Sequence, residues 1–384
     1  MANPLRVVHV YKSYPPVRGG IEGHVDLLTR LLAGRGLRPE VLCGAAAGAP
    51  AREVRDGVQV RRCFTLATVA STPLPPLLPW HLRRSRADVV HLHYPWPPGE
   101  LSYLLAGRGR PLVVTVHCEV IRYPGLGRLL HPLTRRVLSM AQRIVVSSPA
   151  MADTALLAPH ASRVRIIPFG VDLDYFHPDS TAQDPIPHVP HPRILFVGRL
   201  RYYKGLPVLA AALARLPRAH LVVVGEGPER VSLQQALEAH GCRARAHLLG
   251  EVSDDVLLRL LQTADAAALP STSRAEAFGL SIAEAQACAV PAVTSDVGTG
   301  TAETVADGVS GRVVPPNDVA ALADALGWCL DPAHASTLRT AARAHAEAKL
   351  SAKRMTEAIE TIYDELTSAA AGRPRPLHGR GRNR

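Results

Sequence analysis

The sequence predicts an α/β protein made of two consecutive domains, each built on a mainly parallel sheet. Its 384 residues exceed what one hydrophobic core usually supports. Short β-rich runs alternate with helix-length segments in both halves, and this alternation is interrupted once, by prolines between 177 and 192. Hydrophobic residues make up 47% and charged residues 20%, as is typical of a folded globular protein rather than a disordered one.

The first half contains six strand candidates and four helical segments. We expect strands at 6–10, 38–43, 58–62, 88–93, 112–117 and 144–147, and helices at about 21–35, 99–107, 125–142 and 149–158. Strands joined by helix-length segments form right-handed βαβ units, so residues 1–176 are expected to form a Rossmann-like domain. Residues 66–80 are apolar but carry four prolines, which indicates a loop or a docking surface.

A linker and a second domain of the same kind follow. Five prolines within 177–192 indicate a connector, because proline fixes φ and lacks an amide donor. Strands are then expected at 193–197, 220–224, 247–249, 266–269 and 292–295, with helices near 204–216, 229–240, 254–263, 279–289 and 317–330. Residues 193–350 are therefore expected to form a second Rossmann-like domain. A helix at 351–368 should pack back on the first domain, before a disordered basic tail at 369–384.

Charge and cysteine content exclude several classes of protein. Five arginines of the tail supply five of the eleven net positive charges, and the remaining charge suits a nucleotide diphosphate or an anionic bilayer. Nucleic acid is not expected, since no basic segment is interleaved with stacking aromatics. The six cysteines are far apart and predict buried thiols in a reducing compartment. The chain begins with a strand pattern rather than a signal peptide, and no run reaches about 18 apolar residues, so a cytoplasmic location is expected.

Two segments that follow predicted strands indicate a diphosphate site. Gly19 and Gly20 join the first strand to the first helix, where backbone amides can approach an anion, although a plain tight turn explains them equally well. Arg199 and Lys204 follow the strand at 193–197 and should converge on the space between the domains. Two cations there suit a diphosphate whose negative charge grows as the sugar leaves.

Residues 276–285 carry the strongest signal. Gly279 and Leu280 are expected to open a helix whose free amides face the diphosphate. Glu284 lies inside that helix and can accept both ribose hydroxyls, whereas Glu276 precedes the helix and can point toward the donor sugar. An amphipathic helix with two solvated acids explains the glutamates, but it does not explain the Phe278-Gly279-Leu280 between them.

Together these segments resemble the retaining glycosyltransferases of the GT-B fold, family 4, and in particular their rhamnosyl/mannosyl-type subgroup. The similarity covers about residues 5–365 in the right order, and the Glu-x7-Glu block is its most specific part. It implies two Rossmann-like domains facing each other, a nucleotide diphosphate-sugar as donor substrate, no cofactor and no metal. The resemblance assigns the acceptor to the first domain, residues 1–176, and the nucleotide sugar to the second, residues 193–350. The implied site consists of Gly20, Gly279 and Leu280 as amide donors to phosphate, Arg199 and Lys204 as its counter-charges, Glu276 at the donor sugar, Phe278 as a further nucleotide-sugar-binding residue, Glu284 at the ribose, and His117 and Glu119 on the acceptor side. Of these, Arg199, Lys204, His117 and Glu276 are the predicted catalytic residues.

Three further features leave alternatives open. His117 ends the strand at 112–117 and stands two positions before Glu119, an order found in that subgroup, but a satisfied core histidine is the alternative. Residues 172–174 match the Asp-x-Asp metal motif formally, and we interpret them as a structural turn at the exit of a strand. Residues 298–300 read Gly-Thr-Gly where the family often has Gly-Gly, so the contact made there stays open.

The expected reaction moves a hexose or deoxyhexose to an acceptor hydroxyl with retention of configuration. The acceptor is either a lipid-linked or polysaccharide glycan, with the basic helix at 125–143 touching a membrane on its cytoplasmic face, or a soluble aminocyclitol that receives a dTDP-deoxysugar. A nicotinamide-dependent oxidoreductase is the rival from another class. However, Arg230 stands where the Gly225-x-Gly227 segment would need a third glycine. A non-catalytic protein that binds a nucleotide sugar is a third alternative.

Overall fold

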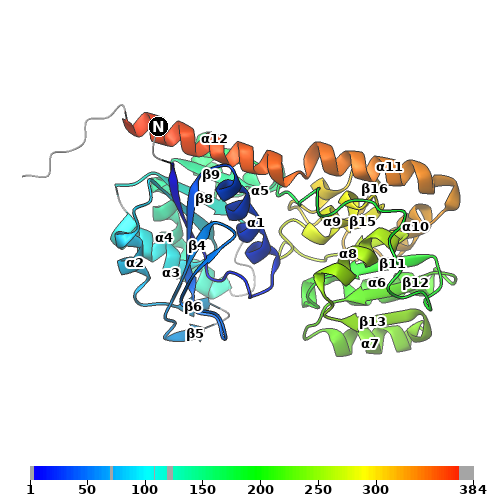
Figure 1. The fold of residues 1–384 in the computed structure, drawn as a ribbon. Coiled ribbons are helices and arrows are strands. Elements are labelled where there is room, and N and C mark those ends of the chain that lie inside the picture. The colour runs from blue at the N-terminus through cyan, green and yellow to red at the C-terminus, as the bar shows by residue number, and fades with distance from the viewer. Residues whose placement is uncertain (1–3, 70–71, 108, 119–123, 372–384) are drawn as a thin grey trace, which may run out of the picture.

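The protein is described from a computed structural model that covers residues 4–69, 72–107, 109–118 and 124–371. The chain forms two lobes, each a sheet covered by helices, and a long pair of C-terminal helices runs along both lobes (Figure 1). This architecture confirms the predicted α/β class with two parallel-sheet units. Glu119 and most of the expected basic tail, residues 372–384, lie outside the described residues.

The first lobe is built on an eight-stranded sheet with the order β10-β9-β8-β7-β1-β2-β4-β3. Its neighbouring strands are parallel except for the pair β3 and β4. The three central strands are almost completely buried and rich in valine, as expected of a parallel sheet covered on both faces. The strands are β1 (Arg6–Val10), β2 (Arg38–Gly44), β3 (Arg52–Arg55), β4 (Val58–Cys63), β7 (Val89–Tyr94), β8 (Leu112–Val116), β9 (Arg143–Val146) and β10 (Val164–Ile166).

The helices of this lobe differ from the prediction at two places. The expected helix at 149–158 ends at Ala152, because Asp153 leaves the helical region with φ −87° and ψ 55°. The proline-rich segment 66–80 is not simply a loop. It holds a small hairpin and the start of a helix in which Pro79 occupies the first turn, where no amide donor is needed. The elements are α1 (Gly20–Gly34), β5 (Ala67–Val69), β6 (Thr72–Leu74), α2 (Leu78–Arg84), α3 (Pro97–Ser102), the π-helical turn η1 (Tyr103–Gly107), α4 (Pro124–Met140), α5 (Pro149–Ala152) and η2 (Ala158–Arg163).

The second lobe has a six-stranded parallel sheet with the order β13-β12-β11-β14-β15-β16. Counted within this lobe, the order is 3-2-1-4-5-6, so the chain reverses direction across the sheet between β11 and β14. The strands are β11 (Arg193–Val197), β12 (His220–Val224), β13 (Ala246–Gly250), β14 (Ala266–Leu269), β15 (Ala292–Ser295) and β16 (Gly311–Val314), the last of which was not predicted. The helices are η3 (Tyr202–Lys204), α6 (Leu206–Ala214), α7 (Arg230–Ala239), η4 (Arg243–Arg245), α8 (Asp254–Thr263), α9 (Leu280–Ala287), η5 (Ala302–Thr304) and α10 (Val319–Cys329).

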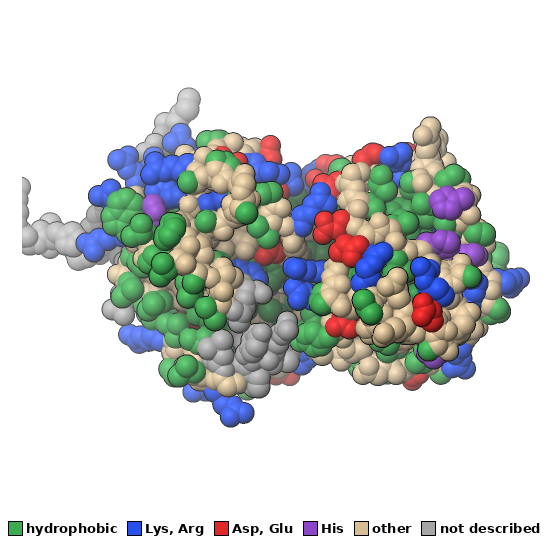
Figure 2. Space-filling model, turned by 90° about the horizontal axis from the view of Figure 1, so that it is seen from below, with side chains coloured by type: hydrophobic (Ala, Val, Ile, Leu, Met, Phe, Trp, Pro, Cys, Tyr) green, Lys and Arg blue, Asp and Glu red, His purple; other side chains and the backbone are tan. Residues whose placement is uncertain are grey.

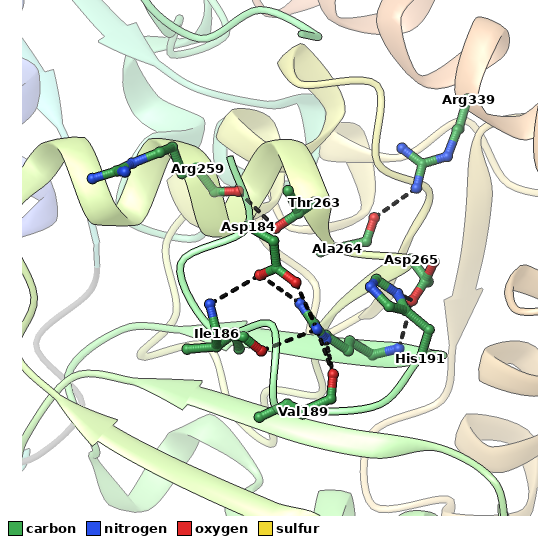
Figure 3. A network of polar contacts seen from close by, with 10 residues as sticks. Asp184, Ile186, Val189, His191, Arg259, Thr263, Ala264, Asp265 and Arg339 are labelled. Carbon is green, nitrogen blue, oxygen red and sulfur yellow. Dashed lines mark hydrogen bonds and ion pairs between the residues drawn. The ribbon is translucent and has the colours of Figure 1, made fainter. Parts of the chain in front are cut away.

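The connector between the lobes is fixed to the second lobe by the buried guanidinium of Arg193. This group donates to Asp184 at 2.8 Å and to the carbonyl oxygens of Ile186 and Val189. Figure 3 shows these acceptors, together with Asp265 beside His191. Hydrogen bonding to Arg193 lowers the pKa of Asp184. We propose that residues 177–192 form the linker between two domains, held along the second one rather than hanging free.

The last two helices, α11 (Pro332–Lys349) and α12 (Ala352–Ala371), tie the lobes together. Helix α11 packs on α9 and α10 of the second lobe, whereas α12 packs on α1 and β7 of the first. The Arg35 side chain binds Glu360 at 2.5 Å and Glu357 at 3.3 Å, and Tyr363 hydrogen-bonds His91 at 2.6 Å. Within the described ranges, no helix combines the length and the apolar character needed to pass through a bilayer.

Candidate functional site

An ion pair stands at the crossover of the second sheet. Lys204 follows β11, Glu276 follows β14, and Lys204 Nζ lies 2.5 Å from Glu276 Oε2. Each of these side chains is 11% exposed, and the buried Ser271 hydroxyl donates to the same carboxylate oxygen at 3.2 Å. Arg199 comes directly after Gly198 at the end of β11, and its side chain is exposed. In a doubly wound sheet the carboxyl ends of strands flanking the crossover are where ligands bind.

The amino end of α9 adjoins this pair. Gly279 is its N-cap, in the left-handed conformation with φ 82° and ψ 52°, and no side chain caps the helix. Leu280 therefore begins a helix whose first amides lack partners within the helix, an arrangement suited to an anion. Glu284 lies one turn further along and is partly buried. Burial, and then the negative charge of Asp254, raise the pKa of Glu284 to about 7.

The amino end of α1 meets α9 across the seam between the lobes. A Cβ atom built on Gly20 would lie 3.8 Å from Leu280 Cδ1, so the two helix N-termini are adjacent. Arg18 reaches across the same seam to the Val252 carbonyl oxygen and to Asp254, both at 3.4 Å. Figure 2 shows the surface narrowing between the lobes, with Lys and Arg side chains along the seam. A side-chain Cβ at position 20 would make only an ordinary van der Waals contact there, so the packing between the lobes does not by itself require glycine.

A cluster of buried histidines lies on the first-lobe side. His117 Nε2 is 3.0 Å from His93 Nδ1, and His93 Nε2 is 3.1 Å from His9 Nδ1. Burial lowers the pKa of His9 and of His24 to about 3, and it lowers the pKa values of His91, His93 and His117 well below the ordinary value. All five imidazoles are therefore neutral at pH 7, and each carries one N–H and one lone pair.

Four buried ring nitrogens of this cluster have no hydrogen-bond partner. They are His9 Nε2, His117 Nδ1 and both ring nitrogens of His24. His24 lies four residues after Gly20, on the same side of α1, with its ring 5.2 Å from that of His117. Because leaving buried polar atoms unpaired costs free energy, this end of the cluster is suited to bind the hydroxyl groups of a ligand.

The histidines also meet the distance requirement for a metal. Two triads, His9/His91/His93 and His24/His93/His117, offer ligand atoms within 4.8 Å of one another. Both ring nitrogens of His93 are already used by His9 and His117, so we treat the cluster as a hydrogen-bonded network. In the Asp-x-Asp segment, Asp172 accepts from the amides of residues 174 and 175, and Asp174 pairs with Lys353, as a structural turn would require.

The structure brings some of the predicted site residues into direct contact. Lys204 and Glu276 are joined directly, and Gly20 meets Leu280. The Phe278 side chain is 2% exposed and packs on Phe169 of the first lobe, with ring centroids 5.3 Å apart, so its ring supports the contact between lobes. Its place in the nucleotide-sugar site stays a prediction.

The two remaining glycine segments are structural as well. A Cβ on Gly225 would lie 2.2 Å from the Gly198 carbonyl oxygen, so the first glycine of the dinucleotide-like segment serves close packing of two strand ends. Gly300 fits against Phe278 in the same way, at 2.4 Å, and holds the seam between the lobes.

Sequence reasoning missed His9, His24, His91 and His93. The sequence held a signal for His91 and His93. They stand two positions apart in β7, and residues at that spacing lie on the same face of a strand. His24 had a helical signal, one turn beyond Gly20. The cross-strand pairing of His9 with His91 depends on the register between β1 and β7, which local pattern does not contain.

Comparison with known proteins adds an independent finding. The profile of the family "Glycosyl transferases group 1" matches residues 182–346, and that of "Glycosyltransferase Family 4" matches residues 18–175. The chain is 36% identical to the D-rhamnosyltransferase WbpZ of Pseudomonas aeruginosa, over 84% of this chain and 86% of the relative. It is 33% identical to the O-antigen chain mannosyltransferase C of Escherichia coli, over 84% and 88% respectively.

The fold has solved counterparts. The sucrose-phosphate synthase of Thermosynechococcus elongatus superposes with a TM-score of 0.80, covering 95% of this chain and all of the other, at 23% sequence identity. The predicted resemblance is thereby confirmed, and the oxidoreductase alternative is wrong. The chain belongs to family 4 of the glycosyltransferases and has the GT-B fold, with two Rossmann-like domains.

Proposed function

We propose that this glycosyltransferase moves a hexose or deoxyhexose from a nucleotide diphosphate-sugar to an acceptor hydroxyl with retention of configuration. The observation that carries the proposal is the buried Lys204–Glu276 pair at the crossover of the second sheet. It puts a cation for the diphosphate beside a carboxylate for the sugar hydroxyls. The free amides at the start of α9 lie next to both.

The proposed chemistry needs stabilisation of a leaving group rather than a nucleophile from the enzyme. Arg199 and Lys204 neutralise the charge that builds up on the departing diphosphate, and the amides of Gly20, Gly279 and Leu280 add partial positive charge. The sugar passes through an oxocarbenium-like state, and the acceptor attacks from the face that the diphosphate leaves. The leaving phosphate takes the acceptor's proton, so neither a metal nor a protein base is required.

The donor substrate is assigned to residues of the second lobe, and the acceptor to residues of the first lobe. Glu276 binds donor sugar hydroxyls and Glu284 binds the ribose. His117 and Glu119 act on the acceptor side, and we add His24 because both of its ring nitrogens are buried and unpaired. Because the two relatives named above are a D-rhamnosyltransferase and a mannosyltransferase, we propose a donor sugar of the manno configuration, with or without its 6-hydroxyl.

The acceptor proposed is a lipid-linked glycan, reached by peripheral contact of the first lobe with a membrane. Supporting this choice, one of the two relatives is named for its action on an O-antigen chain. The alternative acceptor, a soluble aminocyclitol that receives a dTDP-deoxysugar, predicts transfer that does not depend on membranes.

Arg199→Ala and Lys204→Ala test the proposal. A thermal-shift screen against UDP-, GDP-, ADP- and dTDP-sugars first identifies the donor, because a ligand that binds only the native state raises the melting temperature. With that donor, we expect kcat to fall at least a hundredfold in either variant, as for removal of one group that stabilises transition-state charge. The anomeric configuration of the product, read by NMR, tests retention. Near-normal turnover in both variants would refute the assigned roles.

A further inference from the structure

One face of the first lobe exposes an unusual amount of apolar surface. Within the described residues, twelve of the sixteen strongly exposed large apolar side chains fall between residues 17 and 166. The densest group comes from the hairpin β5–β6 and the beginning of α2. We call this group the apolar edge: Phe64, Leu66, Val69, Leu77 and Trp80, which are 63%, 71%, 58%, 52% and 43% exposed. Single exposed apolar side chains are ordinary, but such a group marks an interaction surface.

Neighbouring helices extend the apolar edge. Helix α2 packs against α3 and η1, and α3 packs against α4. These helices add Leu101, Leu105 and Leu129, which are 48%, 64% and 76% exposed. In Figure 2, green apolar side chains and blue basic ones gather together on this lobe.

The two segments that carry the apolar edge and α4 contain basic but no acidic residues. Residues 64–86 and 124–140 contain no Asp or Glu, yet they include the exposed arginines Arg83, Arg84, Arg86, Arg128, Arg135 and Arg136. Across residues 58–166 there are fourteen Lys and Arg against four Asp and Glu. One of those four, Glu100, is buried. An anionic surface is therefore the complementary partner.

We infer that the apolar edge inserts into an anionic lipid bilayer while the surrounding arginines bind its headgroups. Trp80 stacks under the Arg84 guanidinium at 4.2 Å, an amphipathic combination suited to the boundary between headgroups and acyl chains. The apolar side chains protrude from the hairpin segment and α2, and further ones from α3, η1 and α4, rather than lining one groove. A fluid surface accepts such an outline, whereas a protein partner would need a matching rigid shape.

The position of the apolar edge connects it with catalysis, and this step rests on the proposed function. Pro73 of the hairpin packs against Gly44 at the end of β2, and its carbonyl oxygen accepts from Trp96 just after β7. The edge therefore lies beside the carboxyl ends of the first sheet, where α1 and His117 also emerge. A bilayer docked there would present a lipid-linked acceptor to the acceptor lobe. The membrane contact thus extends from the basic helix expected at 125–143 to α2 and the hairpin.

Sedimentation of the full chain with vesicles tests the inference. Phosphatidylcholine vesicles with and without 30% phosphatidylglycerol are compared for wild type, Leu77→Glu/Trp80→Glu and Val231→Glu/Val309→Glu. The last variant is the matched control, since Val231 and Val309 are 61% and 57% exposed on the second lobe. All three proteins keep the arginine-rich tail, so its contribution is constant.

We expect wild type and control to bind the phosphatidylglycerol vesicles equally and the apolar-edge variant to bind at least tenfold more weakly. Equal binding of the apolar-edge variant, or no binding of wild type to these vesicles, would overturn the inference. Thermal shift by the donor nucleotide is measured on the same proteins. A variant that loses vesicle binding but keeps the nucleotide shift is folded, and failure of donor binding in all proteins would instead count against the proposed function.

Discussion

The Lys204–Glu276 pair makes a sharp prediction about stability. Lys204→Met and Glu276→Gln each remove one charge while keeping much of the side-chain shape. The remaining partner then stays largely buried, because each side chain is only 11% exposed in the intact pair. Removing one member of a buried ion pair costs about 3–5 kcal/mol, whereas removing both charges together costs far less.

The expected magnitude follows from the lower end of that range. For a domain of this size, about 1 kcal/mol shifts Tm by roughly 2–4 °C. A loss of about 3 kcal/mol therefore lowers Tm by about 6–12 °C in each single variant. The double variant should melt closer to wild type than either single variant does. This non-additivity is the signature of two charges that stabilise each other.

Calorimetry of the four proteins at pH 7.5 measures these changes. The control is the pair Lys353–Asp174, which has a similar distance of 2.7 Å but side chains 64% and 74% exposed. Lys353→Met and Asp174→Asn should leave Tm within about 2 °C of wild type, because water screens an exposed pair. Single variants that melt like wild type, or a double variant whose loss equals the sum of both, would refute the reasoning.

Three further predictions concern buried titratable groups. In the role proposed for Glu284 at the ribose, the ionised carboxylate accepts hydroxyl groups more strongly than the protonated acid does, so the affinity for the donor nucleotide should rise with pH through about 7. Calorimetric titration at pH 6 and 8 checks this, and Glu284→Gln should abolish the change. Burial raises the pKa of Glu100 from 4.5 to about 7, so the folded state binds this proton more tightly than the unfolded state, and stability should fall by about 3 kcal/mol as pH rises from 4.5 to 7. In Glu100→Gln, thermal unfolding across that range should lack this contribution. Tyr363→Phe leaves His91 Nδ1 unpaired and should cost about 1–3 kcal/mol, measured as Tm, whereas Thr361→Ala on the exposed side of the same helix should cost less.

Local pattern was sufficient to find the strands and the charged segments of the second lobe. Arg199 and Lys204 were visible because a valine-containing strand ends at a glycine, and Glu276 because it stands before a Gly-Leu helix start. The ion pair itself was not visible. It joins residues 72 positions apart and depends on β11 lying next to β14, which is a property of strand order.

The first lobe was harder to predict for two physical reasons. Proline within 66–80 indicated a loop, yet proline is compatible with the first turn of a helix, where α2 places Pro79. The histidine network depends on register, since His9 faces its neighbours only when β1 and β7 align as they do.

The closed Lys204–Glu276 pair also limits how a donor can bind. A diphosphate that takes Lys204 away from Glu276 leaves that carboxylate buried with Ser271 as its remaining hydrogen-bond partner, at 3.2 Å. Sugar hydroxyls on the same donor can then bind Glu276, so the intact nucleotide sugar replaces both halves of the pair, whereas the nucleoside diphosphate replaces one. We therefore expect the nucleotide sugar to raise Tm more than its nucleoside diphosphate does at equal saturation, in the absence of acceptor. In Glu276→Gln no buried carboxylate is left behind, so this difference should shrink. If the nucleoside diphosphate stabilises wild type as well as the intact donor does, the carboxylate does not bind the sugar.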